Sequence, residues 1–177
     1  MGIATANVLS LPASNYDYYI FILAGNANWK GGMLESINNN FEHLAKEIGL
    51  NSVIIKGLIP KELTEDIANT YFNGIENIQS LIPAIFFTNS DPKSVNQNSL
   101  KILIPLTKIE KKFDSIENFF NLLTDFTNKR NNNFIDFTKD NIDWVDGFNK
   151  VIDLKPNAFG IGVNFNGLLE LAFGKKK

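Results

Sequence analysis

The feature that most constrains the fold is an unbroken apolar run, Tyr18-Tyr19-Ile20-Phe21-Ile22-Leu23-Ala24. A strand that is apolar on both of its alternating sides is buried on both faces. We therefore expect this run to lie in the centre of a sheet that is covered on two sides. Apolar residues then recur every three or four positions from Leu34 to Ile48, which predicts a helix, and Gly49 stands where a glycine cap belongs.

The same alternation of strands and helices continues to about residue 130. Strands are predicted at 53–55, 84–87 and 100–104, and helices begin at Pro60 and near Asp114, where Glu117 completes a capping pair. Pro105 favours an edge position for the last strand, because proline has no N–H to donate. The order is β-α-β-α-β-β-α, which predicts an α/β fold in three layers.

The remaining 47 or so residues form a predicted C-terminal extension, so that the chain divides into a domain at 1–130 and an extension at 131–177 packed on the same domain. The pattern predicts a helix at 140–152, a strand at 159–165 and a short helix at 167–173. In the strand, Phe159, Ile161, Val163 and Phe165 share one side and the other side is nearly bare. A second chain could pair with it, so the strand Phe159–Phe165 is a candidate homo-oligomer interface.

Composition removes several chemistries. The 177 residues include no cysteine and one histidine, His43, which excludes thiol catalysis and leaves little for a transition-metal site. A net charge of -2 argues against a nucleic-acid partner. No targeting segment is recognisable, and no apolar stretch reaches the roughly 20 residues that cross a bilayer. We expect a soluble, cytoplasmic protein with no cofactor, no metal and no stable membrane insertion.

One loop carries a resemblance to a known family. Asn28-Trp29-Lys30-Gly31-Gly32-Met33 follows the first predicted strand and precedes a long helix. This arrangement resembles the thioredoxin-like superfamily, in which a loop reading Trp-Cys-Gly-Pro-Cys stands at that place. Trp29 and Gly31 match, whereas Lys30 and Met33 stand at the two cysteine positions and Gly32 also departs from the pattern. Pro83, directly before the third predicted strand, matches the cis-proline of the family. The resemblance covers roughly residues 18–128.

The resemblance implies a redox-inactive member that works as a protein- or peptide-binding module. In the family, extended polypeptide binds between the loop and the cis-proline, so the implied binding residues are Trp29, Lys30, Gly31, Gly32, Met33, Ile82 and Pro83. Two alternatives stay open. The loop amides and Lys30 could bind an anion such as a phosphate at the start of the helix. A thiol-independent enzyme is the weaker alternative, because the sequence offers no paired base and nucleophile.

Overall fold

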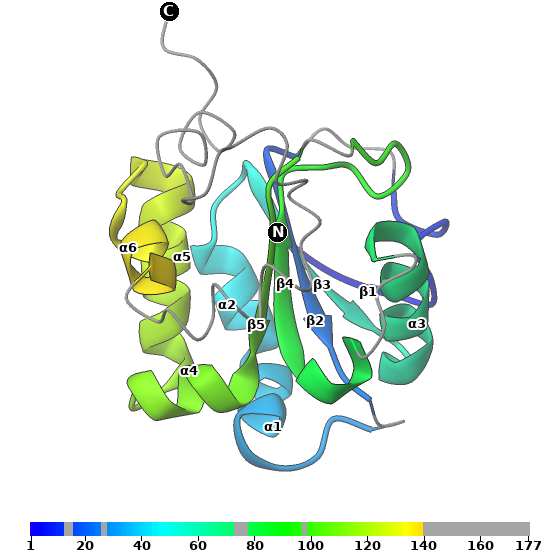
Figure 1. Cartoon of the computed structure of the whole chain (residues 1–177), viewed down its shortest axis with the longest axis horizontal. Helices are drawn as coiled ribbons and strands as arrows, with labels where there is room; N and C mark the ends of the chain where they lie inside the picture. The colour runs from blue at the N-terminus through cyan, green and yellow to red at the C-terminus, as the bar shows by residue number, and fades with distance from the viewer. Residues whose placement is uncertain (13–15, 26–27, 73–77, 97–98, 140–177) are drawn as a thin grey trace, which may run out of the picture.

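The computed structural model describes residues 1–12, 16–25, 28–72, 78–96 and 99–139. Five strands within these ranges form one mixed sheet in the order β1-β3-β2-β4-β5. Figure 1 shows helices on both faces of this sheet, which gives the fold three layers. The α/β class expected from the sequence is confirmed.

The apolar run identified in the sequence is the central strand, β2. Its six residues are all buried. Alternate side chains enter two separate cores, with Ile20 and Ile22 on one face and Phe21 and Leu23 on the other. β2 is parallel to β3 and antiparallel to β4, while β1 and β5 lie outermost. The strands are β1 (Gly2–Thr5), β2 (Tyr18–Leu23), β3 (Ser52–Gly57), β4 (Ala84–Thr88) and β5 (Lys101–Pro105).

Most of the described helices cover one face of the sheet, as Figure 1 shows. They are α1 (Gly32–Asn39), α2 (Phe41–Glu47), α4 (Leu106–Lys112), α5 (Ile116–Lys129) and α6 (Asn133–Lys139). The other face is covered by α3 (Pro60–Tyr71), and a 3₁₀ helix, η1 (Ile78–Leu81), precedes β4. No helix of the described ranges is both long enough and apolar enough to cross a bilayer.

The single helix predicted from Leu34 to Ile48 is wrong in one respect, because the chain breaks at Asn40. Asn40 has φ −100° and ψ 10°, and its Nδ2 donates to the Ser36 carbonyl at 3.1 Å. The apolar stripe continues through the break, so its period does not reveal it. Gly49 follows with φ 91°, which confirms the glycine cap.

The capping pair predicted at Asp114 and Glu117 is also wrong. Ser115 is the N-cap of α5, and its Oγ accepts the N–H of Asn118 at 3.3 Å. The hydroxyl reaches the amide three residues on, as a capping side chain does, whereas Asp114 stands one residue too early.

The predicted extension begins with α6, which packs against α5. Phe134 is fully buried, with its ring centroid 5.3 Å from that of Phe87 and 5.2 Å from that of Phe126. The helix predicted at 140–152, the strand at 159–165 with its oligomer interface, and the helix at 167–173 lie outside the described residues. The domain boundary at 130 stays a prediction.

Candidate functional site

The loop singled out in the sequence lies at one end of the sheet. Because β2 and β3 are parallel and β4 runs the other way, this is the end where β2 and β3 finish and β4 begins. The loop leaves β2 and leads into α1, while the Ile82–Pro83 segment leads into β4. The predicted binding residues therefore approach the same end of the sheet from two parts of the chain.

Trp29 is half-buried and packs against the core on the α1 side of the sheet. Lys56, the last residue but one of β3, lies behind it, with Nζ 5.9 Å from the centroid of the Trp29 ring. The same ammonium lies 4.4 Å from the centroid of Phe41 and donates to Oδ1 of Asn38 at 2.9 Å. Both ring distances fall within the range of cation–π attraction. Lys56 thus ties the Trp29 loop to α1 and α2.

Burial lowers the pKa of Lys56 below its ordinary value of 10.5, and the negative charge of Glu42 partly opposes this shift. Removing water from an ammonium disfavours its charged form, whereas a nearby carboxylate favours it. The contacts to Asn38 and the two rings replace part of the lost hydration. We therefore regard Lys56 as a support for Trp29 rather than as a freely solvated cation.

The start of α1 is occupied by carboxylates of the chain itself. Gly31 N–H donates to Oε2 of Glu35 at 3.0 Å, and Met33 N–H donates to Oε1 of Glu110 at 3.3 Å. Negative groups at this position satisfy exposed amides and face the positive end of the helix dipole. An external anion that used the Gly31 or Met33 amide would have to displace one of these two carboxylates.

The two glycines of the loop have distinct structural roles. Gly31 is the N-cap with φ 94°, and Gly32 begins α1 with φ 53°, both in the left-handed region that glycine adopts readily. A Cβ on Gly32 would lie 3.2 Å from Oε1 of Glu110, so the missing side chain also leaves room for that carboxylate. Lys30 is exposed and makes no ion pair with any described residue.

Ile82 and Pro83 are half-buried, and the peptide bond between them is cis, as the resemblance implies. The Ile82 side chain lies beside the loop, since a Cβ on Gly25 would be 3.6 Å from its Cγ2. The Pro83 carbonyl accepts the N–H of Leu106 at 2.8 Å. Leu106 begins α4, the helix that carries Glu110, so α4 connects the proline segment to the start of α1.

The structure brings some of the predicted residues together and keeps others apart. Ile82 borders the loop on the β4 side of β2, whereas Trp29 contacts the ammonium of Lys56 on the β3 side. No hydrogen bond or ring–ring contact among the described residues joins Trp29 to Pro83. Whether the seven predicted residues act as one binding site stays a prediction.

Three residues of this region were missed in the sequence: Glu35, Lys56 and Glu110. Lys56 gives a usable signal, because it is a lone charge at the end of the apolar run Val53-Ile54-Ile55. Glu35 also could have been found, since it lies four residues after the N-cap and its helix begins with a glycine pair. Glu110 could not, because 77 positions separate it from Met33 and its helix was not predicted.

Comparisons of the chain with protein-family models, with curated proteins and with solved structures found no match. Within the described ranges, no three histidine, aspartate or glutamate side chains gather into a group that could hold a metal ion.

Proposed function

We propose that the chain is a thioredoxin-like interaction module without thiol chemistry, which binds an extended segment of another polypeptide beside Ile82. The proposal is supported by the strand order, with β2 and β3 parallel, β4 antiparallel to β2, and β5 antiparallel to β4. It is supported further by the position of Trp29 to Met33 at the junction of β2 and α1, and of Pro83 directly before β4. These are the landmarks on which the resemblance depends.

The observation that carries the proposal is that the backbone of Ile82 has no hydrogen-bond partner among the described residues. Pairing between β2 and β4 ends at Leu23 and Ala84. The next residue of β2, Ala24, turns away, because its N–H and its carbonyl are both bonded to the hydroxyl of Thr64, at 2.9 and 3.0 Å. Within the described residues, the N–H and C=O of Ile82 consequently make no hydrogen bond.

An unpaired backbone N–H and C=O at the end of a strand are matched by another extended backbone. Gly25 has no side chain at this point, and a Cβ there would lie in van der Waals contact with Cγ2 of Ile82, at 3.6 Å. An extended peptide could therefore pair with Ile82 and place side chains over the loop. The apolar part of Trp29 that remains exposed would then give specificity.

The anion alternative is less well supported, because most of the groups that would bind an anion already have partners. Two of the three loop amides already donate to Glu35 and Glu110, and Lys30 is the one cation of the segment 28–33. The enzyme alternative needs a base beside a nucleophile, and no carboxylate of the described residues pairs with Lys30. Peptide binding uses backbone groups of Ile82 that have no hydrogen-bond partner among the described residues, so it is the function we favour.

The test selects extended peptides from a displayed library against the whole chain and measures their affinity by calorimetry. Trp29→Ala should weaken binding at least about tenfold, which corresponds to about 1.4 kcal/mol. Tyr16→Ala is the matched control, because Tyr16 is a half-buried aromatic residue just before β2, at the opposite end of the sheet. Amide exchange at Ile82 should slow in the complex.

Equal binding by the Trp29→Ala variant, together with unchanged exchange at Ile82, would refute the proposal. A titration with inorganic phosphate tests the alternative separately. Shifts at the Gly31 and Gly32 amides with phosphate, and none with any selected peptide, would favour the anion site instead.

A further inference from the structure

Among the strands that the structure describes, β1 lies at the edge of the sheet. It pairs with β3 on one side, and no described strand pairs with its other side. Ile54 N–H donates to the Met1 carbonyl and Leu58 N–H to the Thr5 carbonyl, each at 2.8 Å. In a parallel ladder, alternate residues direct their backbone groups to the same neighbour. The odd-numbered residues of β1 therefore face β3.

Gly2 and Ala4 consequently direct their N–H and C=O groups away from the sheet. No hydrogen bond to these four groups is found in the part of the chain that the structure describes. β1 reads Gly-Ile-Ala-Thr and carries neither a charge nor a proline. Charged residues and proline are the means by which exposed edge strands normally avoid pairing with other chains. Because β1 lacks both, nothing in its own sequence prevents such pairing.

Apolar side chains gather around the same edge. Met1 and Leu50 lie together at its amino end, where they line one hollow. Leu58 and Ile59 follow β3 at its carboxyl end, beside Thr5, and Leu9 follows β1 itself. These are the large hydrophobic residues that are exposed among those described: Met1 (49%), Leu9 (82%), Leu50 (91%), Leu58 (65%) and Ile59 (46%).

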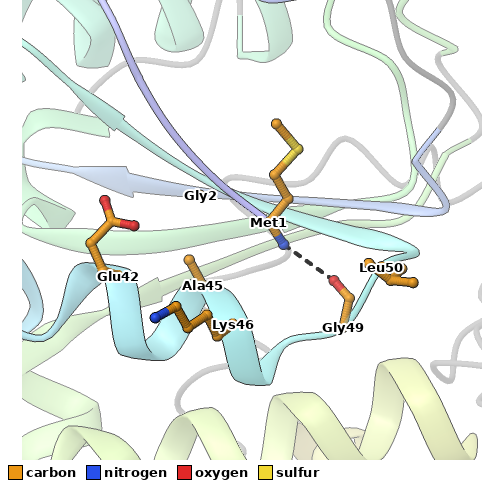
Figure 2. Close-up of a pocket in the computed structure, with 7 residues that line it drawn as sticks. All are labelled: Met1, Gly2, Glu42, Ala45, Lys46, Gly49 and Leu50. Carbon is orange, nitrogen blue, oxygen red and sulfur yellow. Dashed lines mark hydrogen bonds between the residues drawn. The ribbon is translucent and has the colours of Figure 1, made fainter.

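The hollow at the amino end has a volume of about 310 Å³ and lies between β1 and α2. Figure 2 shows Met1 and Gly2 above α2, whose residues Glu42, Ala45 and Lys46 form the facing wall. β1 and α2 approach each other closely here, since a Cβ on Gly2 would lie 2.6 Å from Cβ of Ala45. Glu42 and Lys46 form no ion pair with each other or with any other described residue.

We propose that the β1 edge binds a second copy of this chain through antiparallel pairing of the two β1 strands about a two-fold axis at Ile3. In this register, Gly2 of each copy faces Ala4 of the other. All four outward backbone groups of each strand are then paired, and the two Ile3 residues form the central non-hydrogen-bonded pair. Both sheets become one continuous sheet.

The two-fold axis also explains the surrounding residues. An antiparallel arrangement places the amino end of one strand beside the carboxyl end of the other, so Met1 and Leu50 of one copy approach Leu58 of the second copy. Self-complementary surfaces of this kind are typical of two-fold dimers.

Charge complementarity supports the same partner. The axis makes the two α2 helices antiparallel, so that Glu42 of each copy faces Lys46 of the other, with Ala45 between them. α2 packs on both β1 and β3, since Phe41 approaches Gly2 and Lys56. With strands about 4.8 Å apart, helices centred over β1 and β3 in the two copies would be about 10 Å apart, which is a normal packing distance.

The test measures the sedimentation of the full chain over a series of concentrations. Wild type should form a dimer, and Ala4→Lys should weaken the dimer at least about tenfold, because it places a lysine at the pairing edge. Asn121→Lys, an exposed site on α5, is the control with the same charge change and should have no effect. Thermal unfolding of each variant at low protein concentration verifies that both variants fold.

Charge reversal gives a second, independent readout. Glu42→Lys and Lys46→Glu should each weaken the dimer about five-fold, since each sets like charges against each other, whereas the double reversal should restore it. A wild type that stays monomeric at the highest soluble concentration overturns the proposal. A dimer that Ala4→Lys leaves unchanged also overturns it, as does protection of the Ala4 amide by a selected peptide in a monomeric protein.

Discussion

Replacing Lys56 by methionine tests whether its half-buried ammonium supports the Trp29 loop. Methionine retains an apolar stem of similar length and removes the charge. The substitution abolishes two cation–π contacts, at 4.4 Å from Phe41 and 5.9 Å from Trp29, and the 2.9 Å hydrogen bond to Asn38. Each cation–π contact contributes about 0.5–1 kcal/mol at a partly exposed position, and the hydrogen bond about 1 kcal/mol.

The cost of burying the ammonium opposes these contributions, because burial lowers the pKa of Lys56. We expect the contacts to exceed this cost, so that Lys56→Met lowers the free energy of unfolding by about 1 kcal/mol. Urea denaturation followed by circular dichroism measures the change. Lys30→Met, which removes an exposed lysine without an ion pair, is the control and should change stability by less than about 0.5 kcal/mol.

The pH dependence of the free energy of unfolding tests whether burial lowers the pKa of Lys56. A lysine whose pKa is lower in the folded state binds fewer protons there, so stability increases as pH rises through the interval below 10.5. Lys56→Met should lose this increase. Tyr18 acts in the opposite direction at higher pH, because burial raises its pKa to about 12 in the folded state. Comparison of the two proteins at each pH removes that contribution.

Trp29 fluorescence, measured in a Trp144→Phe background, reports on the loop itself. We expect the Lys56→Met variant to shift the emission of Trp29 to longer wavelength as the ring becomes more exposed to water. A variant that is as stable as wild type and has unchanged emission would refute the reasoning. It would show that the free-energy cost of burying the ammonium equals the stabilisation that its contacts provide.

Three further predictions concern the scaffold. Gly49→Ala should cost about 1–2 kcal/mol from its φ of 91°, and more because the new Cβ would lie 2.5 Å from Oδ1 of Asn128; urea denaturation in an Asn128→Ala background should recover only the second part. Glu110→Gln should speed hydrogen exchange at the Met33 amide, measured by NMR, while the sheet amides keep their rates; equal exchange at Met33 would contradict the cap. Phe134→Ala should destabilise the whole domain by about 3–5 kcal/mol, and an unchanged melting curve would show that α6 is not part of the core.

The strands and helices that the sequence predicts correctly are those whose own side chains decide their structure. β2 is an unbroken apolar run, and α5 carries an apolar stripe over fourteen residues. β1 was not predicted, because glycine and alanine have little preference for strands. Its extended form depends on pairing with β3, a contact between residues some fifty positions apart.

The candidate site divides in the same way. The loop from Trp29 to Met33 and Pro83 can be located from motifs, and the structure places them at one end of the sheet. The groups that bind to the loop come from elsewhere in the chain, since Lys56 belongs to β3 and Glu110 to α4. A motif identifies the residues that form a loop, but only the fold determines which carboxylate or ammonium reaches it.

The two proposed surfaces meet at Lys56. In the sheet, Lys56 is the register partner of Ile22 on one side and of Ala4 on the other. Its ammonium supports Trp29, while Phe41, which it also contacts, packs against Gly2. A second copy paired with β1 would remove further water from this neighbourhood and strengthen the contacts of the ammonium with both rings. Pairing at the edge would therefore make the Trp29 loop more rigid, because the lysine that supports the loop lies between the two surfaces.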